Sequence, residues 1–365
     1  MINKLVWENL KHRWVRTFLC ALVVGVQVML ILTLIGLSRG IMQDTAARQK
    51  GTGADIFLKP DTGATLSLSS GQLKEGFMDL VAKQPHVQQA VGVLSVNVET
   101  ITTLNGTDIP QFEKISTGFR LLKGELPKNP EDLIVDRYYA QQHNLKVGDT
   151  VKLLNRNWRV CGIIEGGMLG RLVVQLKPLQ EMTGNVGRIS EILVKLDDPA
   201  RTNQEVAYFN NLLKGNLRAI STEELVSQLN INNIPQLRNF ITVVVFLAVI
   251  VGFLVVFLSM YTAVVERTRE IGILKALGAK PKTIIDILVR EAILLAVAGC
   301  LIGIALSFGA KALIMGLMPA SLQVITVPEW WPYSALIALA GALLGAIYPG
   351  LKAARQDAIE ALAYE

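Results

Sequence analysis

Charged residues are scarce in this chain: they make up 18% of its 365 residues, whereas a soluble domain carries about 25%. Aromatic residues reach only 6%. The shortage of charge is local, because long stretches carry no charge at all. Runs of this length are typical of membrane spans, so the composition excludes a disordered or fibrous chain and disfavours a purely soluble enzyme.

Cysteine and histidine are also rare. The three cysteines, Cys20, Cys161 and Cys300, have a spacing that fits neither a disulfide framework nor a metal site. The three histidines are isolated, and neither HExxH nor GxxxxGK[ST] occurs. The sequence therefore indicates no zinc protease and no nucleotide-binding loop, and we predict no catalytic, cofactor-binding or metal-binding residue in this chain.

What the chain does contain is four long apolar segments, at residues 17–38, 239–265, 291–315 and 331–351. At 1.5 Å per residue each is long enough to cross, or nearly cross, a hydrocarbon core about 30 Å thick. Lipid offers no hydrogen-bond partners to the backbone, so each span is predicted to be a helix. Four buried core helices in a large soluble protein are the disfavoured alternative. The first segment is too long for a signal peptide and is expected to remain as an anchor.

Basic residues flank the spans unequally. They precede the first span and fill the connection between the second and third spans, whereas the loop at residues 316–330 has none. By the positive-inside rule, both termini and that connection lie in the cytoplasm, and residues 39–238 lie outside. The net charge of +6 thus reflects membrane topology, and it gives no reason to expect nucleic acid as a partner.

The predicted fold is an integral membrane protein with four transmembrane α-helices, one plus three, and a large extracytoplasmic α+β domain between the first and second. The remaining segments are an interfacial helix at residues 1–16, a connection at residues 266–290 and a cytoplasmic tail at residues 352–365.

Residues 39–238 have the texture of a globular α+β domain, which we expect in two lobes divided near residues 105–120. A capping box, Ser221-Thr222-Glu223-Glu224, opens a helix toward the second span. Pro235 is expected to break or kink that helix. Strands are expected at residues 54–59, 90–103, 151–154, 158–164, 171–176 and 191–196, with a helix at 203–215 and a strand followed by a helix at 131–144.

The most informative segment is ERTREIGILKALGAKPKTIIDILVRE, residues 266–291. Its first part is a charge cluster formed by Glu266, Arg267, Arg269 and Glu270. Glu266 and Glu270 are four residues apart, so they share a helix face, and the helix is expected to continue from the second span through Lys275. Gly278 suits a helix terminator, and Pro281 suits the first turn of the next helix. The pattern predicts a helix, a tight turn and a helix; a connector whose charges only enforce topology is equally compatible with the composition.

Three segments carry a family resemblance. ERTREIGILKALGA, residues 266–279, resembles the signature after the second span in FtsX-like and MacB-like ABC transporter permeases. YPGLKAARQDAIEALAYE, residues 348–365, resembles that family's ending, and residues 124–164 resemble its periplasmic domain. With the span layout, these motifs identify the chain as a member of that family, the type VII ABC superfamily, which includes DevC-like and LolC-like members.

The resemblance implies a permease without enzymatic activity of its own, in the inner membrane of a bacterium. It implies a cytoplasmic ABC ATPase that binds ATP and Mg²⁺, a second permease copy or paralogue that completes a dimer, a periplasmic adaptor and membrane lipid as partners. The connection is implied to be the coupling helix, which docks on the ATPase. The residues assigned to ATPase coupling are Glu266, Arg267, Arg269, Glu270, Lys275, Ala276, Leu277, Gly278, Ala279 and Lys280.

The implied activity is mechanotransmission, in which ATP hydrolysis moves the external domain for efflux or extraction of a drug, peptide, glycolipid or lipoprotein. The resemblance implies no polar channel across the membrane. The composition of the spans is consistent with this, since they carry no ionisable residue away from their ends. Two other functions stay open: an FtsX-like scaffold that regulates a periplasmic hydrolase without transport, and a membrane-bound enzyme, for which no clustered nucleophile is visible.

Two glycine pairs are candidates for helix packing. Gly299 and Gly303 lie in the third span, and Gly341 and Gly345 lie in the fourth. Glycines spaced four apart let helices approach closely. Packing of the third span against the fourth within one subunit is preferred here to a role at a dimer face.

Overall fold

The computed structural model describes residues 6–8, 11, 13–61, 73–98, 102–116, 118–230, 233–320 and 322–356. The chain divides into two compact units. The first comprises Met1–Ser38, Pro235–Ile314 and Val324–Glu365, and the second comprises Arg39–Ile234 and Met315–Gln323. Half of the predicted interfacial helix, residues 1–16, and most of the C-terminal tail, residues 352–365, lie outside the described residues.

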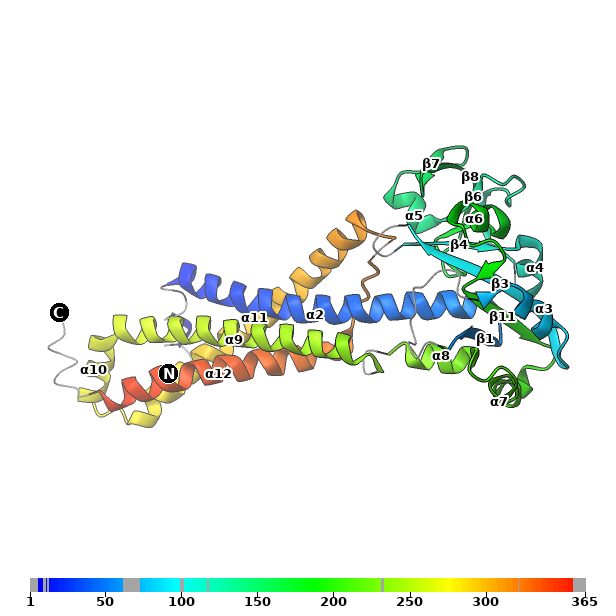
Figure 1. The fold of residues 1–365 in the computed structure, drawn as a ribbon. Helices are drawn as coiled ribbons and strands as arrows, with labels where there is room; N and C mark the ends of the chain where they lie inside the picture. The colour runs from blue at the N-terminus through cyan, green and yellow to red at the C-terminus, as the bar shows by residue number, and fades with distance from the viewer. Residues whose placement is uncertain are drawn as a thin grey trace. The chain divides into compact units, whose positions relative to one another are not determined.

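Long apolar helices build the first unit (Figure 1). In the described part of the chain, four helices are long and apolar enough to cross a membrane. One precedes the α+β domain and three follow it, which confirms the predicted fold class. Pro235 is the first residue of its helix, where a missing N–H does no harm, so the expected break or kink is a helix start. The four are α2 (Trp14–Gly51), α9 (Pro235–Glu266), α11 (Pro281–Leu317) and α12 (Trp331–Arg355).

Helices α9 and α12 run side by side in the first unit (Figure 1). Gly345 of α12 faces α9, where a Cβ atom in its place would lie 3.1 Å from the carbonyl oxygen of Phe253. Ala338, Ala342 and Ala346 recur at every fourth position of α12 and are buried in the core that all four helices share. Small side chains thus lie where the helices meet and let their backbones approach closely. This is expected in a bilayer, which supplies no hydrophobic driving force between helices.

A mixed β-sheet organises the second unit. Within the described residues it has ten strands in the order β12-β1-β11-β3-β4-β9-β6-β8-β5, with β7 paired to β8. The pairs β4–β9 and β6–β8 are parallel, and the others are antiparallel. The strands are β1 (Ile56–Pro60), β3 (Val87–Asn97), β4 (Thr103–Thr107), β5 (Leu121–Gly124), β6 (Asp132–Asp136), β7 (Thr150–Leu153), β8 (Arg156–Ile164), β9 (Leu172–Gln175), β11 (Glu191–Leu196) and β12 (Leu217–Ser221); β2 (Leu73–Lys74) and β10 (Arg188–Ile189) pair separately.

Both faces of the sheet are buried. Consecutive residues of β1 alternate between two cores, with Ile56 and Leu58 in one and Phe57 in the other. Strands covered on both faces carry continuous apolar runs, as the interior strands here do. Helices α3 (Gly76–Ala82), α5 (Arg137–Gln142), α6 (Leu176–Thr183) and α7 (Thr202–Leu212) contribute to the first core, and α4 (Ile109–Ile115) and α8 (Thr222–Gln228) contribute to the second.

The expectation of two lobes divided near residues 105–120 is wrong. Strand β4 lies in the middle of the sheet, α4 packs against the neighbouring strand β3, and β5 returns to the same sheet. The polar run around residue 105 belongs to a buried strand whose Asn105 accepts a hydrogen bond from the Ser95 hydroxyl, at 2.7 Å. Most predicted strands are present, and the Ser221 hydroxyl caps α8 by accepting from the Glu224 amide at 3.0 Å.

Asp132 opens strand β6 and is almost completely buried. Its carboxylate accepts hydrogen bonds from the amides of Lys128 and Asn129 and from Arg159, whose Nη2 lies 2.7 Å away. Burial by itself raises the pKa of Asp132, but these hydrogen bonds outweigh it and hold the pKa below its ordinary value. A lowered carboxyl pKa stabilises the fold above the unfolded-state pKa, and this contribution is lost as pH falls through the folded-state pKa.

Replacing Asp132 with Asn is therefore expected to lower the free energy of unfolding at pH 7 by about 1–3 kcal/mol, because an amide group then faces two backbone donors. Urea unfolding of the full chain, followed by circular dichroism at pH 7 and in acid, measures this difference, which should shrink as pH falls. Exposed Asp61, changed to Asn, is the control. Equal destabilisation by both variants would contradict the stabilising role of the buried Asp132 carboxylate.

Candidate functional site

The connection between α9 and α11 contains a short helix of its own. Helix α10 (Thr268–Ala276) follows α9 after one non-helical residue, Arg267, with φ −109° and ψ 18°. Gly278 has φ +93° and ends the helical stretch, and α11 begins at Pro281. The predicted helix, turn and helix are confirmed. A continuous helix from α9 through Lys275 is wrong, because the chain breaks at Arg267.

A buried ion pair accompanies this break. Arg267 Nη1 lies 3.0 Å from Glu291 Oε1, and the side chain of Glu291 is only 3% exposed. The hydroxyl of Thr268 bonds back to the carbonyl of Val265 at 2.8 Å, a pattern that bends helices. The pair thus fixes the start of α10 against α11. Glu291 is missing from the predicted site because it stands at the edge of an apolar run, where a charge is easily assigned to topology.

The charges of the predicted cluster have different partners. Glu266 Oε2 accepts from Arg16 Nη1 at 2.7 Å and also pairs with Arg13. Arg269 and Glu270 are exposed. Glu266 and Glu270 therefore do not act as one charged face, since the break at Arg267 separates them.

Lys275 is turned toward the fourth span. Its Nζ donates to the carbonyl oxygens of Ala354, at 2.9 Å, and Gln356, at 2.5 Å. These carbonyls lie at the C-terminal end of α12, where helix carbonyls lack intrahelical partners and favour a cation. Lys275 thus holds α10 to α12.

The tip of the connection is its most exposed part. Leu277 is 81% exposed, an unusual value for a large apolar side chain. Ala276, Gly278 and Lys280 are also exposed, and Ala279 is half-buried. The arrangement places an apolar residue on a short turn whose supporting helix is tied to α11 and α12.

The span glycines pack on different partners from those expected. A Cβ atom at Gly303 would lie 2.6 Å from the Gly25 carbonyl oxygen, and one at Gly299 would lie 2.6 Å from Val24. Both contacts are with α2, and Gly345 contacts α9. The predicted packing of the third span against the fourth through these glycines is therefore wrong. The contacts that Gly299, Gly303 and Gly345 make instead are within one subunit, as expected. Gly341 has no atom within 4 Å of its Cβ position.

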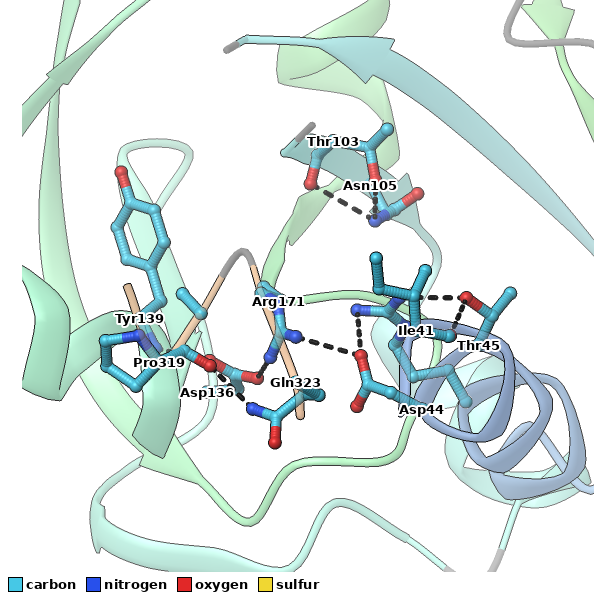
Figure 2. A network of polar contacts seen from close by, with 12 residues as sticks. Ile41, Asp44, Thr45, Thr103, Asn105, Asp136, Tyr139, Arg171, Pro319 and Gln323 are labelled. Atoms are coloured by element: carbon cyan, nitrogen blue, oxygen red, sulfur yellow. Dashed lines mark hydrogen bonds and ion pairs between the residues drawn. The ribbon is translucent and has the colours of Figure 1, made fainter. Parts of the chain in front are cut away.

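A second polar centre, absent from the predicted site, lies in the second unit and is called here the Arg171 cluster. Figure 2 shows Arg171 between Asp44 and Asp136. Arg171 Nη2 lies 2.8 Å from Asp44 Oδ2, and its Nη1 lies 2.8 Å from Asp136 Oδ2. Arg48 pairs with Asp44 at 3.1 Å, so the cluster contains two cations and two anions.

The Arg171 cluster is largely closed to water. The side chains of Arg171 and Asp136 are 7% and 3% exposed. Burial raises the pKa of Asp136, and this exceeds the opposing pull of Arg171 and of the Tyr139 amide. Buried ion pairs add little net stability because desolvation offsets their attraction. Residues 127 positions apart meet in the Asp44–Arg171 bond, so no local sequence signal could have paired them.

Fold and connection together define a class of membrane protein with one span, an inserted α+β domain and three further spans. The family profile of the MacB-like periplasmic core domain matches residues 17–212. The profile of the FtsX-like permease C-terminal domain matches residues 242–358. The chain belongs to the FtsX-like and MacB-like family of ABC transporter permeases.

Several relatives are similar along most of this chain. The macrolide export ATP-binding/permease protein MacB of Aggregatibacter actinomycetemcomitans is 26% identical over 325 residues, which are 80% of this chain and 50% of the relative. MacB of Hahella chejuensis is 25% identical, covering 99% of this chain and 60% of the relative. The chain therefore spans one half to three fifths of these relatives. The "Putative hemin transport system permease protein HrtB" of Staphylococcus haemolyticus is 23% identical over 98% of both chains.

Two solved structures are similar to about half of the chain. The periplasmic region of MacB from Actinobacillus actinomycetemcomitans has a TM-score of 0.38 and 18% identity, covering 48% of this chain and 94% of that one. The extracellular domain of the transporter YknZ from Gram-positive bacteria has a TM-score of 0.35 and 14% identity, covering 46% and 98%.

Removing one partner of the buried pair at the break should destabilise the first unit. Arg267→Met leaves Glu291 buried without this cation, which is expected to lower stability by about 3–5 kcal/mol. The double variant Arg267→Met/Glu291→Leu should recover most of the loss. Thermal unfolding in detergent measures both. The control is Arg290→Met, which removes an exposed pair with Asp286 and should change stability by less than about 1 kcal/mol. A double variant as unstable as Arg267→Met would contradict this account.

Gly303→Leu should force α2 and α11 apart, because the new side chain meets a backbone carbonyl that cannot move aside. Overpacking of this kind lowers stability by about 1–3 kcal/mol. Gly309→Leu is the matched control on the same helix, at an exposed position with nothing near its Cβ, and it should unfold near the wild-type temperature. The reverse order of the two unfolding temperatures would show that Gly303 does not set the distance between α2 and α11.

Proposed function

We propose that the chain is the permease subunit that couples ATP hydrolysis by a separate cytoplasmic ATPase to conformational change in the extracytoplasmic domain. The change drives export or extraction of a substrate, with drugs, peptides, glycolipids and lipoproteins as the substrate classes. The observation that carries this proposal is the exposed tip at Leu277 on a helix held from behind by buried and capping contacts.

The contacts behind the tip support a coupling role. A docking element transmits a push only if it moves together with the spans. Arg267 is paired with Glu291 of α11, and Lys275 donates to carbonyls at the end of α12. Pressure on the turn would thus pass into two spans, while the break at Arg267 lets α10 take a direction different from α9.

The relatives support the same role. HrtB bears the name of a permease protein and is similar over nearly its whole length. The MacB relatives are named as ATP-binding/permease proteins for macrolide export. In our proposal ATP and Mg²⁺ bind the ATPase, a second permease copy or paralogue completes the dimer, and a periplasmic adaptor joins on the outer side. The termini and the connection face the cytoplasm, and the membrane is the bacterial inner membrane.

Replacing Leu277 with Glu tests the proposal. Because a charge placed at the centre of an interface removes an anchor and remains unpaired, ATPase stimulation by the permease should fall by about thirtyfold or more. The measurement is ATP turnover of the ATPase reconstituted with wild-type or variant permease in nanodiscs, together with copurification of the two chains.

The matched control is Leu212→Glu, which adds the same charge at an exposed leucine of α7. It should leave turnover unchanged. Full stimulation by Leu277→Glu, or equal losses in both variants, would contradict the coupling role. A substrate-export assay on cells lacking the chain then separates transport from a non-transport scaffold, because only the former predicts substrate retention.

A further inference from the structure

Helix α5 lies between two chain segments that are distant in sequence but belong to the same unit. One is residues 39–51, the C-terminal part of α2. The other is Met315–Gln323, from the loop that joins the third and fourth spans. Figure 2 shows Pro319 and Gln323 of the second segment beside Tyr139 and Asp136, and Asp44 of the first segment on the other side of Arg171.

The first segment reaches α5 through the Arg171 cluster. Asp136 is the N-cap of α5 and accepts from the Tyr139 amide at 2.7 Å. The second carboxylate oxygen of Asp136 accepts a hydrogen bond from Arg171 Nη1. Arg171 Nη2 donates to the carboxylate of Asp44 in α2. A single guanidinium therefore joins α2 to α5, with each arm engaged in a charge-assisted hydrogen bond.

The end of α2 is also fixed by backbone contact. A Cβ atom at Gly51 would lie 1.9 Å from the Gly167 carbonyl oxygen, so only glycine fits there. Gly53 follows with φ +72° and lies against the backbone of Ile115 and Ser116. Residues 39–51 thus have little freedom to slide within the second unit.

The second segment is also hydrogen-bonded to the last residue of α5, Gln142. The Ala320 amide donates to Gln142 Oε1 at 3.0 Å. Ala320 is 1% exposed and belongs to the same core as Tyr139 and Ala140. Gln323 folds back to the Pro319 carbonyl at 2.6 Å, which closes the turn around the buried alanine.

We propose that α5 is the common point at which movements of the first span and of the loop between the third and fourth spans enter the external domain, with Arg171 as a positioning residue. This inference rests on the proposed function, and it adds the place where movement of the spans enters the external domain. A buried guanidinium separated from one of its two carboxylates would lose half of its charge-assisted hydrogen bonds in a dry site, so the three groups should move together.

A purely structural role is the competing explanation. Two kinds of evidence separate the two: whether breaking one link loosens the other, and whether α5 responds to nucleotide bound elsewhere. Coupling between sites is established by such a shared response and not by proximity alone.

Hydrogen exchange of the full chain in nanodiscs tests the first point without any ATPase. In Asp44→Asn, amides at residues 39–51, 137–142 and 318–323 should all exchange faster, by about tenfold or more, because the buried cluster has lost a charge. Asp44→Glu keeps the charge and should restore much of the protection. The matched control is Glu191→Gln, whose carboxylate is as exposed as that of Asp44 and pairs with Lys59 at 3.3 Å.

Faster exchange confined to residues 39–51 would overturn the proposal, and so would the same pattern in Glu191→Gln. The second arm adds the partner ATPase, trapped with ATP and vanadate. Wild-type α5 should change its exchange rate, and Asp44→Asn should lose that change while α10 still responds. A response at α10 without one at wild-type α5 would refute the inference and leave the proposed function standing. No response at α10 would count against the function, and the first arm would still decide whether α5 is the common point.

Discussion

Hydrocarbon gives apolar helices no reason to prefer one neighbour over another, and the rest of this structure depends on how that constraint is met. Two devices meet it. Glycines and alanines let backbones touch, as Gly303 does on α2 and Gly345 does on α9. Paired charges then fix directions where the helices leave the apolar region, and a charge removed from its partner in such a place is strongly unfavourable.

The two polar centres share one physical character. Arg267 with Glu291, and Arg171 with Asp44 and Asp136, are each shielded from water and each join segments far apart in sequence. Such pairs contribute little net stability, so their value lies in fixing geometry. In our account the first holds the docking element rigid behind Leu277, and the second carries displacement into the β-sheet. A mechanical transporter needs stiffness at both places.

Local patterns were enough to predict the spans, the α+β class, most strands, and the turn at Gly278 and Pro281, because each depends on neighbours in sequence. Long-range partners were beyond reach. Nothing near Lys275 indicates that it turns toward α12, and Gly299 carries no mark of whether α2 or α12 faces it. Asp136 at the end of one apolar run and Arg171 at the start of another were the available signal for the second centre, but pairing them with Asp44 required the fold. The predicted ATPase-coupling set remains a prediction.

Sidedness of the membrane tests the central claim most directly, because the coupling scheme requires the connection and the external domain to face opposite compartments. Leu277→Cys and Asn155→Cys provide exposed labelling sites, whereas the native cysteines are all buried. A membrane-impermeant maleimide applied to right-side-out vesicles should label residue 155 and leave residue 277 unlabelled until the membrane is opened. Labelling of residue 277 from outside would contradict the account.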